Sequence, residues 1–186
     1  MDKSWIEKKI IELKNKFCSN ANITVPPSYA QKNTFSGTEA QVNLDRWKNN
    51  EFTLTIYPSF FKISKKNAEF VLAHEIMHIK DIISNDFGYD GSLRGYNGCD
   101  RIANLENTIW EISIDMRLEK MGYAKIQEYN ERVSEYINTH WPQYKNRFTL
   151  DINDLAEVIN NPTCGGIKSL AERKNNDWIE YLTNKN

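Results

Sequence analysis

The sequence predicts an α+β fold, in which a small, mostly antiparallel sheet, an N-terminal helix and a central helix precede a helical C-terminal part. Strand-like alternation falls between residues 23 and 57, whereas apolar residues at helical spacing dominate the chain after residue 64. At 186 residues, the chain is long enough for a hydrophobic core without disulfide bonds. We therefore expect a single domain, 1–186, with two subdomains, 1–85 and 86–186, that share a cleft.

The first subdomain is expected to contain two helices and three strands. Apolar residues recur at helical steps over 3–17, which predicts an amphipathic helix. Ser64 is a suitable N-cap for the central helix, which should run to about Ile83. The clearest strand is the last one, because its apolar residues alternate with threonines. The three strands are predicted at 23–25, 39–44 and 52–57.

The second subdomain is expected to be helical. It begins with a glycine-rich stretch, 84–101, that is either a functional loop or a plain connector. Gly122 should terminate the first helix after it, and Asp154 with Glu157 would form a capping box for a short helix. The helices are predicted at about 102–121, about 124–138, 154–159 and after a turn at 162–166.

Composition excludes several classes of protein. The net charge is −1 with both signs mixed along the chain, so we expect neither a nucleic-acid-binding face nor a polybasic membrane patch. The charged N-terminus lacks the apolar segment of a secretory signal, and no apolar run is long enough to span a membrane. Cys18, Cys99 and Cys164 are far apart and odd in number, which favours free thiols. These features predict a cytoplasmic protein whose partners are peptides or proteins.

The chemistry is expected in the central helix, in the stretch AEFVLAHEIMHIKDII (68–83). His74 and His78 are four residues apart, so a helix points both imidazoles the same way and lets them hold one Zn²⁺. Glu75 lies close enough to take a proton from a water that the metal activates. The remaining residues are mostly apolar, and buried imidazoles need partners, which either a metal or a mutual hydrogen bond supplies. The HExxH motif favours the metal and predicts a zinc peptidase.

A catalytic zinc ion needs three protein ligands and an open fourth position, so the motif must be completed from elsewhere in the chain. Glu111, on the helix predicted at about 102–121, is the preferred third ligand. Asp115, one turn further on, would accept the free ring N–H of a ligand histidine and fix its tautomer. The other candidates are Asp81, as an exposed acid or a partner of a ligand, Asp90 in the glycine-rich stretch, and His140.

The segments AHEIMHIKD and WEISIDMRLEKMGY resemble the gluzincins, zinc peptidases that combine HExxH with a later E-x-x-x-D. Within that clan the chain is most similar to the HtpX and CAAX-prenyl-protease-like family, in a soluble, minimal form. The run FTLTIYPSFFKISKKNAEFVLAHEIMHIKD resembles that family's strand, turn and helix, and the likeness covers about residues 50–125. It implies a zincin-like fold, the zinc ligands His74, His78 and Glu111, and Glu75 as the general base and then the acid.

A weaker likeness in THWPQYKNR implies one more functional residue. Gluzincins usually stabilise the charge on the substrate's carbonyl oxygen with a downstream histidine or tyrosine. His140 is the candidate here, with Tyr136 and Tyr144 as reserves, and a surface histidine at a helix end is the alternative. The chain departs from the family pattern by an inserted Trp141, by Ile114 in place of a small residue, and by the lack of membrane helices.

The sequence therefore predicts a zinc-dependent endopeptidase. One alternative is a non-catalytic or latent regulatory protein that retains the fold and acts by binding a partner. Another is a domain that the metal only stabilises, although such a site would normally fill all four positions with protein ligands.

Overall fold

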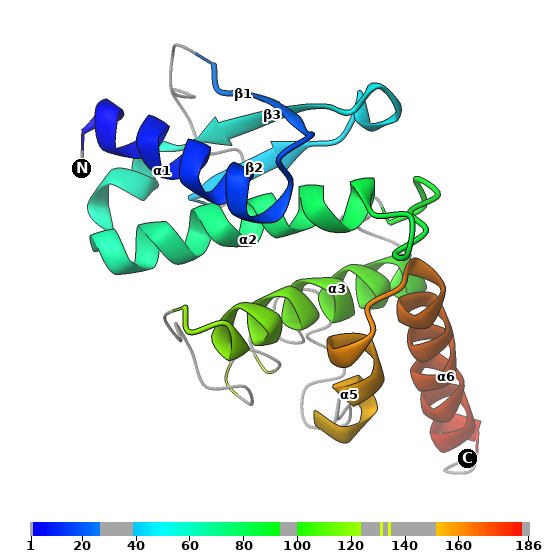
Figure 1. Ribbon diagram of the computed structural model, residues 1–186. Helices are drawn as coiled ribbons and strands as arrows, with labels where there is room; N and C mark the ends of the chain where they lie inside the picture. The colour runs from blue at the N-terminus through cyan, green and yellow to red at the C-terminus, as the bar shows by residue number, and fades with distance from the viewer. Residues whose placement is uncertain are drawn as a thin grey trace. The chain divides into compact units, whose positions relative to one another are not determined.

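The structure, a computed structural model, has an α+β fold (Figure 1). Five α-helices and a three-stranded sheet occur among the residues that it describes, so this part of the chain is mostly helical. The predicted α+β class is confirmed. The chain divides into two compact units, Met1–Ser84 with Gly122–Ala124 and Asn85–Met121 with Lys125–Asn186. The described residues are 2–26, 39–93, 100–123, 131, 134 and 152–183.

The sheet of the first unit is mixed, and the prediction of a mostly antiparallel sheet is wrong. Its strands are β1 (Asn22–Thr24), β2 (Ala40–Asn43) and β3 (Glu51–Ile56), in the order β1-β3-β2. β2 is antiparallel to β3, as expected for strands joined by a short connection, whereas β1 is parallel to β3. A parallel neighbour needs a longer crossover connection, and β2 separates β1 from β3 in the sequence.

β3 supplies one face of the core of this unit. Phe52, Leu54 and Ile56 are buried, while the residues between them are partly exposed. This is the alternation that the sequence predicts for the strand, because successive side chains point to opposite faces of a sheet. The other face of β3 is therefore more exposed to solvent.

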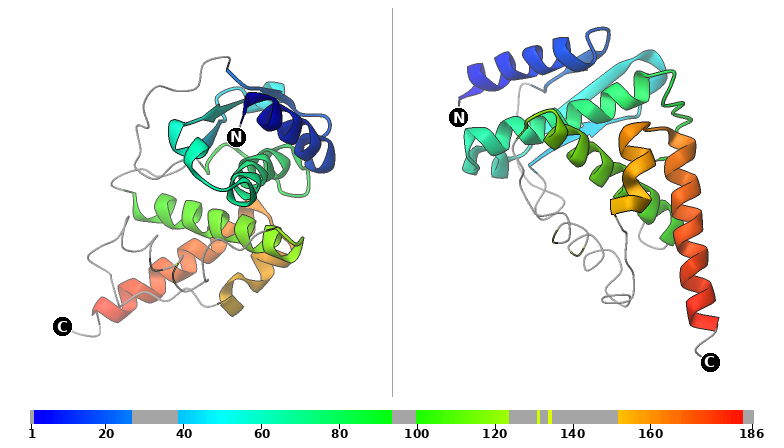
Figure 2. Two further views of the ribbon diagram at one scale, coloured as in Figure 1. Left: turned by 90° about the vertical axis from the view of Figure 1, so that its left-hand side faces the viewer. Right: turned by 60° about the horizontal axis from the view of Figure 1, so that its bottom comes forward.

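Two helices complete the first unit and pack against each other, as Figures 1 and 2 both show. α1 (Lys3–Phe17) buries an apolar stripe of Ile6, Ile10 and Leu13, as predicted. α2 (Lys65–Ile83) also packs against β2 and is buried along most of its circumference. The side chain of Ser64 accepts a hydrogen bond from the backbone N–H of Asn67 at 3.2 Å, so the predicted N-cap is confirmed.

The second unit consists of α3 (Arg101–Lys120), α5 (Ile152–Asn160) and α6 (Cys164–Thr183), with α5 and α6 against α3 (Figure 2). Gly122 follows α3 with φ at +86°, a left-handed conformation that glycine adopts readily. The helix predicted at about 124–138 lies almost entirely outside the described residues.

The starts of α5 and α6 differ from the predictions. Asp154 lies inside the first turn of α5 and pairs with Lys174 of α6, so it does not form the predicted capping box. α6 begins within the stretch predicted as a turn, because Thr163 Oγ1 accepts a hydrogen bond from the N–H of Gly166 at 2.9 Å. That hydroxyl acts as a helix cap that was not predicted from the sequence.

The described part of the glycine-rich stretch, 85–93, is anchored within the second unit. The ring of Phe87 stacks on that of Trp110, with centroids 5.7 Å apart, and its carbonyl accepts from the N–H of Cys164. Asp90 then accepts a hydrogen bond from Lys168 Nζ at 2.6 Å. These contacts hold this segment to α3 and α6.

Cys18 and Cys164 are buried free thiols, as the sequence predicts, and Cys99 lies outside the described residues. Burial raises the pKa of the Cys18 thiol to about 11 and also raises the pKa of Cys164. Both thiols are therefore poor nucleophiles at neutral pH. Within the described ranges, no helix has both the length and the hydropathy that a membrane crossing requires.

We predict that Ser64→Ala lowers the free energy of unfolding by about 1 kcal/mol, because it removes the acceptor that caps α2. Ser19→Ala, in an exposed turn, is the control and should change it by less than about 0.5 kcal/mol. Urea unfolding followed by circular dichroism measures both. Equal effects of the two substitutions would show that the cap does not stabilise the helix.

We predict that Asp90→Asn lowers the free energy of unfolding at pH 7 by at most about 1 kcal/mol, because the Asp90 side chain is 54% exposed and solvent screens the pair. Hydrogen bonds from Lys168 and Ser92 hold the pKa of Asp90 well below its usual range. Its contribution is therefore complete above the carboxyl pKa of the unfolded chain, about 4, and is lost as pH falls below that value.

Urea titrations of wild type and Asp90→Asn at several pH values check this expectation. The difference between the two proteins should shrink from about pH 5 to about pH 3. Asp177→Asn, an exposed carboxylate on α6, is the matched control. A difference that grows in acid would show that the Asp90–Lys168 pair is not the cause.

Candidate metal centre

The candidate centre begins with two histidines on one face of α2. His74 and His78 are one helical turn apart, and their rings lie with centroids 4.9 Å apart at an interplanar angle of 68°. His78 is only 6% exposed, and Phe70, one turn before His74, contacts the His74 ring. The polar imidazole edges are thus held in largely apolar surroundings, where they need partners.

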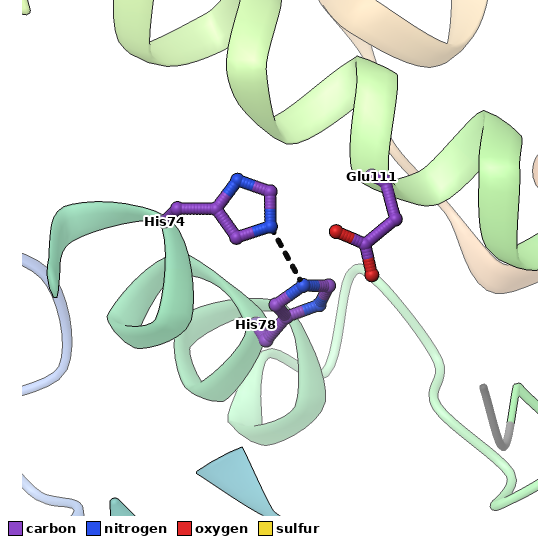
Figure 3. Close-up of side chains that lie close together, drawn as sticks. All are labelled: His74, His78 and Glu111. Atoms are coloured by element: carbon purple, nitrogen blue, oxygen red, sulfur yellow. Dashed lines mark hydrogen bonds between the residues drawn. The ribbon is translucent and has the colours of Figure 1, made fainter. Parts of the chain in front are cut away.

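The two imidazoles converge on one point, as Figure 3 shows. The distance between their Nε2 atoms is 3.1 Å. Two nitrogen ligands of a tetrahedral zinc ion, each at the usual 2.0–2.1 Å from the metal, lie about 3.3 Å apart. A hydrogen bond between two neutral rings also fits this distance, with one ring as donor and the other as acceptor. The Nε2 atoms are therefore placed both for a shared metal and for a mutual hydrogen bond.

Glu111 is a third potential ligand beside the two histidines. Glu111, on α3, is half-buried, and it forms a group of three potential ligands with His74 and His78 (Figure 3). Each of these residues offers one ligand atom, and the three atoms lie within 4.8 Å of one another. Two imidazole nitrogens and one carboxylate oxygen are a ligand set that Zn²⁺ accepts, so this group could hold a metal ion.

Asn107, which was not among the residues predicted from the sequence, is a neighbour of this group. It is 4% exposed, and its side-chain Nδ2 donates to Glu111 Oε1 at 3.5 Å, a long hydrogen bond. It precedes Glu111 by four residues, so it lies on the same face of α3. The four-residue spacing in the sequence could have predicted this contact, since an asparagine one turn before a candidate ligand can orient the carboxylate of that ligand.

The side chain of Glu75 has a different partner from the side chains of the two histidines. Its Oε2 accepts a hydrogen bond from the backbone N–H of Val42, on β2, at 2.7 Å. Glu75 is not part of the three-residue group found among the described residues. The carboxylate therefore lies at the sheet, on the side of α2 that packs against β2.

The structure does not bring the other sequence candidates into this group, as far as it describes them. Asp115 is buried, one turn after Glu111, and its role towards a ligand histidine stays a prediction. Asp81 is 3% exposed, so its interpretation as an exposed acid is wrong. The carboxylate of Asp90 is engaged by Lys168 and Ser92 in the second unit. The proposed donors of the oxyanion site, His140, Tyr136 and Tyr144, lie outside the described residues.

The chain was also compared with known proteins. No protein-family model matches it, and neither a curated protein nor a solved structure shows significant similarity to it.

Proposed function

We propose that this protein is a zinc-dependent endopeptidase of the gluzincin type. The observation that carries the proposal is the convergence of two imidazole nitrogens, 3.1 Å apart, on a helix whose next residue after the first histidine is a glutamate. Imidazole pairs with this spacing are typical of zinc sites, and an adjacent glutamate is typical of zinc peptidases.

Three residues would hold the metal, with His74, His78 and Glu111 each supplying one ligand atom. Two nitrogens and one carboxylate oxygen suit Zn²⁺, and three protein ligands leave a fourth position for water or substrate. Zinc bound there would polarise the scissile carbonyl and make water more acidic. Asn107 would keep the carboxylate of Glu111 directed at the metal.

Glu75 would act as the general base and then the acid. Its carboxylate accepts a hydrogen bond from β2 and is not one of the three potential ligands, which supports a role in proton transfer and not in metal binding. As a base it would take a proton from the attacking water, and as an acid it would return that proton to the leaving amine. His140 remains the proposed donor to the oxyanion, on the strength of the family resemblance alone.

The proposed substrates are peptides or proteins, and the proposed location is the cytoplasm. The net charge of −1 supports these proposals only by favouring neither nucleic acids nor membrane surfaces as partners. No observation specifically favours the alternative of a latent or non-catalytic partner-binding protein. It would become the preferred function if metal is bound without turnover.

We predict one zinc ion per chain and a loss of zinc affinity of at least about a hundredfold in Glu111→Ala, because losing even an outer-shell partner costs 10 to 100-fold. Competition with a chromophoric chelator measures the affinity, and elemental analysis measures the content. Glu119→Ala, the same change two turns along α3, is the matched control and should leave both unchanged.

The same assay tests the competing ligands. Asp90→Asn should bind zinc with wild-type affinity, because its carboxylate pairs with Lys168. Zinc affinity that survives Glu111→Ala and falls in Asp90→Asn or His140→Ala would contradict the proposed ligand set.

We predict that Glu75→Gln keeps one zinc ion per chain and lowers kcat on casein by roughly 10²-fold to 10⁴-fold, because it removes the proton-transfer group and no ligand. The fluorescence of labelled casein fragments measures turnover. Glu69→Gln, on the same helix and paired with Lys9, is the control and should retain wild-type kcat. Wild-type turnover in Glu75→Gln would exclude Glu75 as the base, and a zinc-loaded wild type without turnover on any protein tested would exclude the peptidase.

A further inference from the structure

We propose that the backbone N–H of Val42 is the positioning group for the carboxylate of Glu75. The proposal rests on the proposed function, because it assigns the donor that aims the catalytic base. The distance from Val42 N to Glu75 Oε2 is 2.7 Å, which is short for an N–H···O bond and typical of a charged acceptor.

The register of the sheet explains why this N–H is available. Tyr57 donates its N–H to the carbonyl of Glu39, and Gln41 lies opposite Thr55. In an antiparallel pair, hydrogen-bonded and non-hydrogen-bonded positions alternate, so Val42, opposite Leu54, belongs to a non-hydrogen-bonded pair. The N–H of Val42 therefore points away from β3, towards the outer edge of β2.

β2 is an outer strand of the described sheet, in the strand order β1-β3-β2, and α2 is the helix that packs against it. An outward N–H would otherwise be an unpaired donor at the sheet edge. The carboxylate of Glu75 satisfies this donor, so one bond serves both the strand and the glutamate.

Val42 is a stiff anchor for a catalytic group. Val42 is 8% exposed, Ala40 is 4% exposed, and β3 pairs with the other edge of the strand. A backbone donor in such a strand has no side-chain rotamers of its own. The bond to Oε2 therefore limits rotation of the Glu75 carboxylate and keeps it in one orientation, as a positioned general base requires.

The activity test uses proline to delete the N–H. Val42→Pro removes the donor without breaking a β2–β3 ladder bond, because this N–H is not part of the ladder. In the zinc-loaded protein, kcat on casein should fall by roughly tenfold to a hundredfold, the usual worth of a hydrogen bond to a charged group, with KM and zinc content unchanged. Ala40→Pro places the same ring two residues earlier on the same edge and should keep kcat within about threefold. Wild-type kcat in Val42→Pro would overturn the proposal.

Amide hydrogen exchange tests the hydrogen bond between Val42 and Glu75 without metal or turnover. It therefore also tests the proposal if Val42→Pro does not fold. In the metal-free protein, the Val42 amide should exchange at least about tenfold faster in Glu75→Ala than in wild type, while the paired amide of Gln41 keeps its rate. Glu69→Ala, on the same helix, should change neither amide. Equal exchange of Val42 in Glu75→Ala and wild type would overturn the proposal.

The two arms separate failure of this inference from failure of the proposed function. If the zinc-loaded wild type has no turnover but the Val42 amide depends on Glu75, the peptidase is excluded and the bond has only a structural role. If wild type is active and the Val42 amide is independent of Glu75, the peptidase stands and the positioning group is wrong.

Discussion

Burial of polar side chains on α2 is the constraint on which the candidate centre depends. The helix is enclosed by apolar residues along most of its length, yet it carries two imidazoles and three carboxylates, and both His78 and Asp81 are buried. A polar group removed from water without a partner costs several kcal/mol, or more if it is charged. Each of these groups must therefore have a defined partner, and such partners also fix the orientation of the side chain.

The geometry of a helix separates the two chemical tasks of the motif. Successive residues are rotated by about 100°, so His74 and His78 share a face while Glu75 points to another. The histidine face presents two converging nitrogens, and the glutamate face meets the outer edge of β2. A small sheet is enough to hold the carboxylate of Glu75, because only one backbone donor of one strand is needed.

Several buried polar side chains of α3 bond to the backbone of the same helix. Thr108, Ser113 and Arg117 are buried, and each donates a side-chain hydrogen bond to a carbonyl three or four residues earlier. The contact from Asn107 to Glu111 has the same four-residue spacing. Such local bonds help to satisfy polar groups that are removed from water.

The sequence by itself determined the elements that depend on local periodicity: the limits of α1, the cap and length of α2, the alternation of β3 and the spacing of the HExxH residues. These follow from the 3.6-residue and two-residue repeats, which are properties of neighbouring residues. Only the tertiary structure decided the mixed sheet, the bond from Val42 to Glu75 and the pairing of Asp90 with Lys168. These depend on which distant segments the chain path brings together, and on strand direction and register, which residue spacing does not encode.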